Sequence, residues 1–305
     1  MPPVALLLVI VAAFAHATWN LASKRASASG LPFILLGAIA STVLWLPIAG
    51  VDIAINGADL RWLLIGSGVS AVIHVGYMWV LQRGYAHGDI SVVYPMARGT
   101  GPLLSVVFAI VLFHEHPSAL ALAGAAVVVA GIVGIGLTTG RPATGAQAQP
   151  TTPQPGMRPS RRPRMLGPGI LYGLLTGVTI AVYTLWDAFT VNDLGVSPVA
   201  FMVGCSLGEV VLLAPVLITR RAEVVSVWRR FRWQAVVVGV LSPMSYILVL
   251  SAIQLAPVSL VAPARELSVV LVSLAGWLIL REPRPAQRMA GAVVVLGGVA
   301  MLALS

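Results

Sequence analysis

Charged residues are scarce in this sequence: they make up 10% of its 305 residues, whereas apolar residues make up 58%. A soluble globular domain carries roughly 25% charged residues, because its surface must interact with water. The shortage therefore excludes an ordinary soluble fold and indicates a membrane protein with several spans. Cysteine is almost absent as well, and a single one, Cys205, cannot form an intramolecular disulfide.

Lysine is also nearly absent, since Lys24 is the only one among nineteen cations that give a net charge of +9. Most arginines lie in short clusters between apolar runs rather than along one face. This pattern is typical of the positive-inside rule and not of a surface that follows nucleic-acid phosphates, so no nucleic-acid partner is expected. The sequence lacks a phosphate-binding Gly-Lys-Ser/Thr loop, a His-Glu-x-x-His pair and a Gly-x-Ser-x-Gly elbow, so we predict no enzyme activity, no catalytic residue, no cofactor and no metal site.

Ten apolar runs are long enough to cross a bilayer, which takes about 20 mostly apolar residues in a helix. The long run at 233–280 holds two of them, separated at 254–257. We therefore predict an all-α integral membrane protein with ten transmembrane helices. The predicted spans are 4–23, 31–51, 62–82, 90–113, 117–140, 165–186, 194–219, two within 233–280, and 285–305.

Residues 139–166 differ from the spans, because they are rich in proline and arginine and have almost no large apolar side chains. We predict a disordered connector there, between two five-helix halves at 1–138 and 167–305. The halves match at an offset of 167 residues, which indicates an internal duplication. The matched pairs are Trp19-Asn20 with Trp186-Asp187, Arg98 with Arg265, Glu115 with Glu282, Gly124 with Gly291, and Gly131 with Gly298.

An odd number of spans in each half reverses the orientation of the second half in the membrane. Inverted repeats of this kind are typical of transporters, and their substrate site lies at the interface between the repeats. The sequence therefore predicts two inverted five-helix repeats around a central cavity.

The cations in the loops predict the orientation. Sixteen lie in the connector and in the loops after the first, third, seventh and ninth spans, and only Arg61 lies in the other loops. Because cytoplasmic loops carry an excess of Lys and Arg, we expect the connector to be cytoplasmic and both termini to lie outside, in the plasma (inner) membrane. Trp62, Trp228 and Trp233 lie at span ends, where tryptophan is typical of a membrane interface.

Several segments resemble the EamA type of the drug/metabolite transporter superfamily. In the first half they are residues 16–24 (His-Ala-Thr-Trp-Asn-Leu-Ala-Ser-Lys), residues 94–99 (Tyr-Pro-Met-Ala-Arg-Gly) and Glu115. The resemblance implies a ten-helix fold of two inverted repeats and a secondary carrier for small metabolites, often amino acids or their relatives, frequently exported. It implies neither the substrate nor the coupling ion. The matching residues of the second half are Pro263, Ala264, Arg265, Glu266, Arg281, Glu282 and Gly291.

Ionisable side chains near the middle of a span are costly, so each is expected to have a partner or a role. Glu209 has no basic neighbour in its span, and desolvation favours its protonated form, so it is a candidate proton-coupling group; the alternative is a structural hydrogen bond or a pair with Arg98. Glu266 is the second such candidate, and as the helix neighbour of Arg265 it is not expected to pair with it. Arg98 and Arg265 are predicted either to bind a substrate carboxylate or phosphate, or to pair with Glu209, Glu266 or helix-end carbonyls.

Five spans carry polar residues three or four apart, on one face of an otherwise apolar helix. Because polar stripes facing lipid are costly, we predict that these faces converge on a cavity. Hydrogen bonds between helices are the alternative for any single pair. The predicted substrate-binding residues are His16, Trp19, Asn20, His74, Tyr77, Tyr94, Arg98, Tyr183, Trp186, Asp187, Ser245, Tyr246 and Arg265.

Backbone irregularity is expected in the fourth span. Gly99, Gly101 and Pro102 predict either a broken helix that exposes backbone groups to a ligand or a place of close helix packing.

The function that these features favour is secondary transport of a small polar metabolite, an amino acid or a related compound, by alternating access and in the direction of export. The partners expected are the small-molecule substrate and the lipid bilayer, and the sequence leaves the choice between monomer and homodimer open. A flippase for lipid head groups or lipid-linked metabolites is the main alternative, and an embedded enzyme acting on lipid phosphate is a weaker one. A channel is disfavoured, because no ring of like charges or repeated pore loop is visible.

Overall fold

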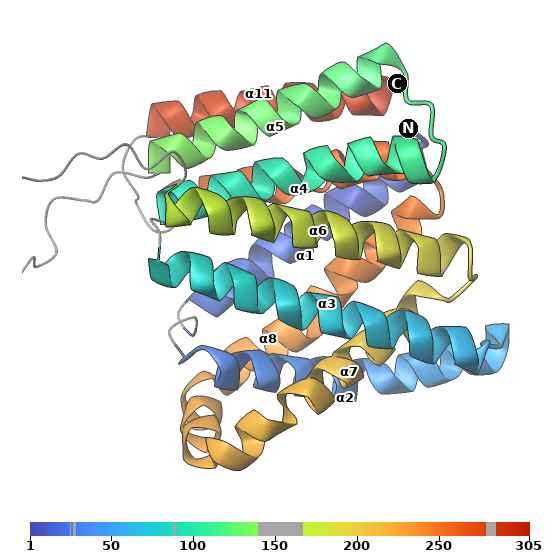
Figure 1. Ribbon diagram of the computed structural model, residues 1–305, viewed down its shortest axis with the longest axis vertical. Coiled ribbons are helices and arrows are strands. Elements are labelled where there is room, and N and C mark those ends of the chain that lie inside the picture. Colours follow the sequence, from blue (N-terminus) through green and yellow to red (C-terminus); the bar gives the residue numbers. More distant parts are fainter. Residues whose placement is uncertain (25, 27–28, 88–89, 140–166, 279–284) are drawn as a thin grey trace, which may run out of the picture.

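The structure, a computed structural model, describes residues 1–24, 26, 29–87, 90–139, 167–278 and 285–305, and among these its only regular elements are helices (Figure 1). The predicted connector lies outside the described residues apart from Thr139, and Arg281, Glu282 and Arg284 also lie outside them. The helices are α1 (Pro3–Lys24), α2 (Leu31–Asn56), α3 (Leu60–His87), α4 (Ile90–Leu112), α5 (Ala119–Thr139), α6 (Pro168–Asn192), α7 (Pro198–Thr219), α8 (Arg221–Ile253), α9 (Val258–Ala264), α10 (Leu267–Leu278) and α11 (Pro285–Leu304).

Eight segments of the described chain are long and apolar enough to cross a membrane, with α9 and α10 together forming one of them at Val258–Ala275. Two further apolar stretches, Ala119–Ile135 in α5 and Met289–Leu304 in α11, are shorter. Each predicted span overlaps one of these ten segments. The chain is therefore a helical multi-span membrane protein, while the count of ten crossings stays a prediction.

The structure corrects the position of the broken helix. α4 continues without interruption through Pro95 and Pro102, so the expected break in the fourth span is wrong and the alternative, close packing, holds: a side chain at Gly101 would meet Ile180 of α6. The break instead separates α9 from α10, where the amides of Glu266 and Ser268 donate to the carbonyls of Pro263 and Arg265, three residues earlier. Inside a membrane, proline and glycine can leave backbone N–H and C=O groups without their helical partners, and neighbouring helices then supply hydrogen bonds to them.

The beginning of α8 also differs from the prediction. The sequence places the start of this span at Trp233 and the preceding arginines in a loop, but the helix begins at Arg221. Phe231 has non-helical backbone angles (φ −127°, ψ 21°), so α8 consists of a short first part and a longer second part that meet at a kink.

The two halves of the chain are interleaved rather than side by side. α1 contacts α8 and α10, while α6, which occupies the matching place in the second half, contacts α3 and α4. The helices α2 and α7 contact each other, as do α4 and α9, and α5 and α11 lie together at one edge of the bundle (Figure 1). Every one of these neighbour relations therefore has its counterpart with the halves exchanged.

The contact between α5 and α11 is made by glycines at matched positions. A Cβ added at Gly124 would lie 2.9 Å from the carbonyl oxygen of Gly298, and one added at Gly131 would lie 3.2 Å from that of Gly291. The sequence predicts Gly124 and Gly131 to match Gly291 and Gly298, so each glycine contacts the counterpart of the other. Only residues without side chains let the two backbones approach this closely.

Glu115 joins the two halves near one end of the bundle. Its carboxylate oxygens accept hydrogen bonds from the amides of Val258 (2.7 Å) and Ser259 (2.9 Å), the first residues of α9. An acidic group is stabilised at a helix N-terminus, where free amides point outward. Glu115 thus holds the beginning of a helix that belongs to the other half. Its counterpart Glu282 lies outside the described residues.

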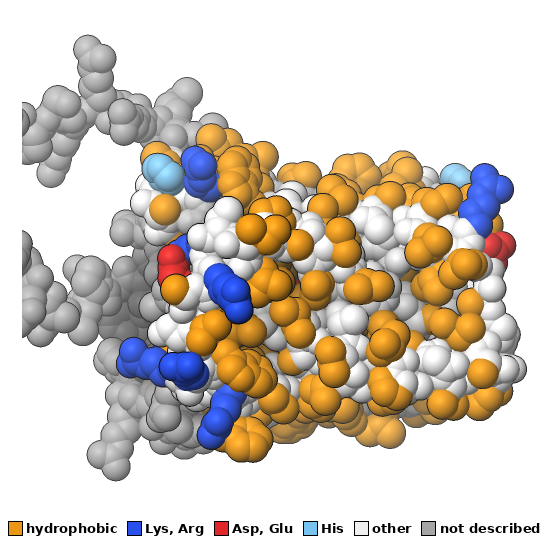
Figure 2. Space-filling model, turned by 90° about the horizontal axis from the view of Figure 1, so that it is seen from below, with side chains coloured by type: hydrophobic (Ala, Val, Ile, Leu, Met, Phe, Trp, Pro, Cys, Tyr) orange, Lys and Arg blue, Asp and Glu red, His pale blue; other side chains and the backbone are white. Residues whose placement is uncertain are grey.

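The surface has the layout of a protein embedded in a bilayer. Figure 2 shows hydrophobic side chains across the middle of one face and charged side chains gathered toward its two ends. Exposed residues of this kind include Leu64, Val107, Val182 and Val211. In water such a surface would drive aggregation, whereas lipid tails cover it without cost.

The glycine contact predicts a difference between two substitutions in α5. Gly131→Leu forces a side chain against Val295 and the Gly291 carbonyl, whereas a Cβ at Gly134 meets nothing within 4 Å. Overpacking costs about 1–3 kcal/mol, so Gly131→Leu should lower the thermal unfolding temperature of the purified protein in detergent and Gly134→Leu should leave it unchanged. Equal unfolding temperatures for the two variants would contradict the close contact.

Candidate functional site

A cavity of about 460 Å³ lies between the two halves of the bundle. Its lining comes from α1, α2, α3, α4, α6, α7 and α8, and from Arg265 at the break between α9 and α10. The convergence expected for the polar stripes is therefore present. The predicted residues that line the cavity are His16, Trp19, Asn20, His74, Tyr77, Tyr94, Arg98, Tyr183, Ser245, Tyr246, Arg265 and Glu209.

The cavity reaches one end of the bundle and not the other. On α1 its lining runs from Ala12 to Ser23, at the C-terminal end of the helix, and on α3 it runs from His74 to Tyr85. Gly30, which precedes α2, also lines it. At the opposite end, helices pack against one another, and polar side chains join their backbones: Trp186 Nε1 donates to the Gly66 carbonyl at 2.9 Å. The cavity thus leads to the end where α1 stops and α2 begins.

A cluster of one carboxylate and two guanidinium groups lies beside the cavity. Arg98 Nη1 donates to Glu266 Oε1 at 3.2 Å, and Arg265 Nε lies 3.8 Å from the same oxygen. Glu266 is fully buried, so its charge depends on these cations. Arg98 also contacts His16, with 3.2 Å between Nη2 and Nε2, where the neutral ring accepts the hydrogen bond.

Arg265 and Glu266 form an ion pair at 3.8 Å without a hydrogen bond, which corrects the expectation that they do not pair, while Glu266 finds its hydrogen-bond partner elsewhere, in Arg98. That expectation assumed a regular helix, in which adjacent side chains point about 100° apart. The chain leaves the α-helix at these two residues, and the flexible stem of Arg265 turns its Nε toward the neighbouring carboxylate. For Arg98 the structural alternative is confirmed, because Glu266 is its partner.

The two matched arginines differ in how fully they are satisfied. Arg98 has both a carboxylate and an imidazole as partners. Arg265 is only 9% exposed, yet its Nε and Nη2 atoms have no hydrogen-bond partner among the described residues. A buried guanidinium with free donors is costly to maintain, and a ligand carboxylate or phosphate would satisfy it.

Aromatic rings form one wall next to Arg265. The guanidinium carbon of Arg265 lies 5.9 Å from the centre of the Tyr183 ring, within the range of a cation–π interaction. Tyr183 in turn stacks on His74 with 4.3 Å between ring centres, and its edge contacts Tyr77 and Tyr246. The wall therefore offers flat apolar surface close to hydrogen-bond donors.

The sequence predicts that Asp187 and Trp186 line the cavity, and the structure corrects this prediction, because neither is among the lining residues. Asp187 is fully buried behind it and accepts hydrogen bonds from Ser70 Oγ (2.7 Å) and Tyr246 Oη (2.6 Å). The Trp186 ring points to Gly66 of α3. Both side chains form hydrogen bonds with neighbouring helices instead. The polar stripe of α6 is wider than the part of the helix that faces the cavity, so some of its residues face other helices.

Sequence reasoning missed two members of this polar group. Ser70 lies between Asp187 and His74, whose Nδ1 is 3.1 Å from its Oγ, and Cys205 Sγ lies 3.7 Å from the same hydroxyl. Ser70 precedes His74 by four residues, so the stripe on α3 contained the signal. Cys205 carried no such signal, because a lone cysteine in an apolar run is ordinary.

Glu209 lines the cavity, and within the described chain it has no ion pair. The structural alternative of a pair with Arg98 is not present, since Arg98 pairs with Glu266. Glu266, the other candidate for proton coupling, does not line the cavity and lies between two cations.

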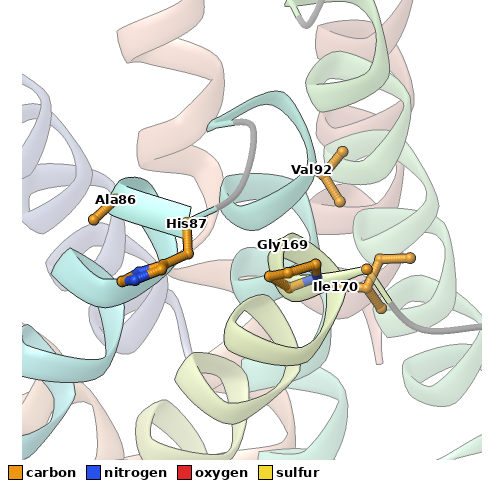
Figure 3. Close-up of a pocket in the computed structure, with 7 residues that line it drawn as sticks. Ala86, His87, Val92, Gly169 and Ile170 are labelled. Carbon is orange, nitrogen blue, oxygen red and sulfur yellow. The ribbon is translucent and has the colours of Figure 1, made fainter. Parts of the chain in front are cut away.

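A second hollow, of about 520 Å³, lies where α3 ends and α4 and α6 begin (Figure 3). Its described lining is Ala86, His87, Val92 and residues 167–170. His87 is the one ionisable side chain among them, and its ring stacks on Tyr172. The central cavity, with its several ionisable groups, is therefore the candidate site.

Comparison with known proteins supports a transporter. The profile of the EamA-like transporter family matches residues 3–137 and again residues 167–304. No curated protein matches the chain. A solved crystal structure of a protein with 20% identical residues covers 100% of this chain and 98% of its own, with a TM-score of 0.67, which shows a shared fold. Because the family profile matches both halves of the sequence, this chain belongs to the EamA-like transporter family.

Proposed function

We propose that this chain is a secondary carrier that exports a small polar metabolite, an amino acid or a related compound, across the plasma membrane by alternating access. The observation that carries the proposal is the cavity between the halves, which reaches one end of the bundle and holds Arg265 with free donors. A carrier needs such a site, accessible from one side at a time.

Ten spans in two inverted repeats are part of the proposal. The reciprocal neighbours of the two halves support it, because elements related by a two-fold axis contact each other's counterparts. The glycine pairs Gly124–Gly298 and Gly131–Gly291 repeat this relation at single residues.

The direction of access follows from charge. The cavity reaches the end of the bundle near Lys24 and Arg83, which the positive-inside rule assigns to the cytoplasm. This conformation would then load substrate from the cytoplasm. Release outside requires the opposite end to open, and there the hydrogen bonds of Glu115 to α9 are contacts between the halves that must change.

The cavity favours a substrate with an anionic group and an apolar or flat body. The anionic group would bind the free donors of Arg265, and the body would lie against Tyr183 and Tyr77. Glu209 is the stronger candidate for proton coupling, because it lines the cavity without a cation partner among the described residues, whereas Glu266 does not line the cavity and lies between Arg98 and Arg265.

The first experiment measures transport in reconstituted vesicles with an imposed pH gradient, screening amino acids, small organic acids and phosphorylated metabolites. We expect flux of one anionic class, and Arg265→Gln should reduce that flux at least about tenfold, since hydrogen bonds to charged groups contribute about 1.5–3 kcal/mol. Arg61→Gln, which removes an exposed cation outside the cavity, is the control. Absence of flux for every soluble compound would overturn the proposal in favour of a lipid substrate.

A second experiment addresses coupling through Glu209. Glu209→Gln removes the proton-binding carboxylate and keeps its size, so substrate-driven proton movement should disappear and transport should lose its pH dependence. Glu223→Gln removes an exposed carboxylate at the bundle end and should change neither. Full proton coupling in Glu209→Gln would contradict this role, and tracer exchange without proton movement in the unaltered protein would indicate an exchanger or facilitator instead.

A further inference from the structure

The first part of α8 is too long to belong to the membrane-spanning part of the helix. α8 has 33 residues, which at 1.5 Å per residue measure about 50 Å, whereas the hydrocarbon core is about 30 Å thick. About 20 residues suffice to cross it. Roughly the first 13 residues, up to the region of Trp233, must therefore lie outside the hydrocarbon.

This surplus segment changes direction and runs across the end of the bundle. The kink at Phe231 separates residues 221–230 from the rest of the helix. In Figure 1 the first turns of α8 form a separate coil at the lower left, beside the end of α7 and across the direction of the long helices. A helix placed this way lies along the membrane surface rather than through it.

One face of the segment is held by the protein. Val224 is buried in an apolar cluster with Phe33, Leu36 and Leu213, and Val227 and Phe231 pack against the same cluster. These three residues follow one another at helical spacing, so the segment has a fixed rotation about its axis. The side chains on its other face consequently point away from the protein, in a fixed direction.

The free face combines arginines with large apolar side chains. Arg221, Arg229 and Arg232 are exposed there, and Val225 and Trp228 between them are 41% and 42% exposed. Trp233 follows with 70% of its surface exposed, and the guanidinium of Arg232 lies 5.9 Å from its ring centre. Figure 2 shows arginine and lysine side chains of this kind beside hydrophobic ones at one end of the molecule.

The charge of this face is not balanced within the described chain. Glu223, the only acidic residue of the segment, pairs with Arg220 through two hydrogen bonds. Arg221, Arg229, Arg230 and Arg232 have no ion pair among the described residues. Guanidinium groups at the depth of lipid head groups bind phosphate well, because their planar donors match its oxygens.

We propose that the segment Arg221–Trp233 is a binding site for anionic phospholipids of the adjoining membrane leaflet. Arg229 and Arg232 bind the phosphate groups, and Val225, Trp228 and Trp233 enter the boundary between head groups and acyl chains. Arginines attract anionic head groups, and tryptophan and valine beside them insert at the boundary with the acyl chains, so this mixed free face has that preference. The site lies away from the cavity and does not depend on the transport proposal.

The test compares lipid binding by the full-length protein and two double variants in zwitterionic detergent micelles. The measurement is the ratio of the dissociation constants for short-chain phosphatidylcholine and phosphatidylglycerol. We expect the unaltered protein to prefer phosphatidylglycerol, and Arg229→Gln with Arg232→Gln to lower that preference at least about fivefold, since each basic residue near an anionic surface contributes about 1 kcal/mol. Arg220→Gln with Glu223→Gln removes the exposed ion pair at the beginning of the same helix at constant net charge and should keep the preference.

Two further measurements keep the result interpretable. Arg229→Lys with Arg232→Lys retains the charge and should retain most of the preference, which separates lost charge from a damaged fold. High salt should weaken the preference of the unaltered protein, because the screening length falls from about 10 Å at 0.1 M to about 3 Å at 1 M. The proposal is overturned if the unaltered protein shows no preference, or if the glutamine variant at Arg229 and Arg232 keeps it.

Discussion

The buried carboxylate of Glu266 connects the two halves at the centre of the molecule. A charge in a low-dielectric interior must have partners, and here Arg98 from the first half and Arg265 from the second share one oxygen. The break between α9 and α10 places this carboxylate beside the cavity. The guanidinium groups of the same two arginines lie over aromatic rings, Arg98 over Tyr94 and Arg265 over Tyr183. Both halves thus contribute a cation to this one buried charge, of which the second oxygen, Oε2, has no hydrogen-bond partner among the described residues.

Close backbone contact between α5 and α11 complements the central ion pair at the edge of the bundle. In lipid, helices gain little from burying apolar surface, so association depends on tight packing and on polar contacts. Glycines at matched positions supply the packing between these helices, and Glu115 supplies a polar contact at the beginning of α9. The halves are thus joined at several separate places, and a carrier that alternates its access can change some of these contacts while keeping others.

Matched positions in the two halves have acquired different tasks. Arg98 has a carboxylate and an imidazole as partners, whereas its counterpart Arg265 keeps free donors beside the cavity. Asn20 donates to the His16 carbonyl within its own helix, whereas its counterpart Asp187 accepts hydrogen bonds from α3 and α8. The two halves share a fold, and the differences between their matched residues make the surroundings of the cavity asymmetric.

The amino-acid sequence by itself determined the helical membrane class, the division into two matched halves and most of the ionisable and aromatic residues that line the cavity. These follow from local quantities: the length of apolar runs, the spacing of polar residues on one helix face, and the offset between the halves. Similar reasoning identified Arg98, Arg265 and Glu209 as residues that need a partner or a role, because an ionisable group in hydrocarbon is costly wherever the helix packs.

Only the tertiary structure decided which of these groups meet. It paired Glu266 with Arg98, turned Asp187 toward Ser70 and Tyr246, interrupted the helix at Arg265 rather than at Gly101, and folded the first turns of α8 along the end of the bundle. Spacing along one helix gives the direction of a side chain relative to that helix alone. Which group that side chain contacts depends on the rotation and distance of the neighbouring helices. Close packing between segments far apart in the sequence, such as α5 and α11, determines both.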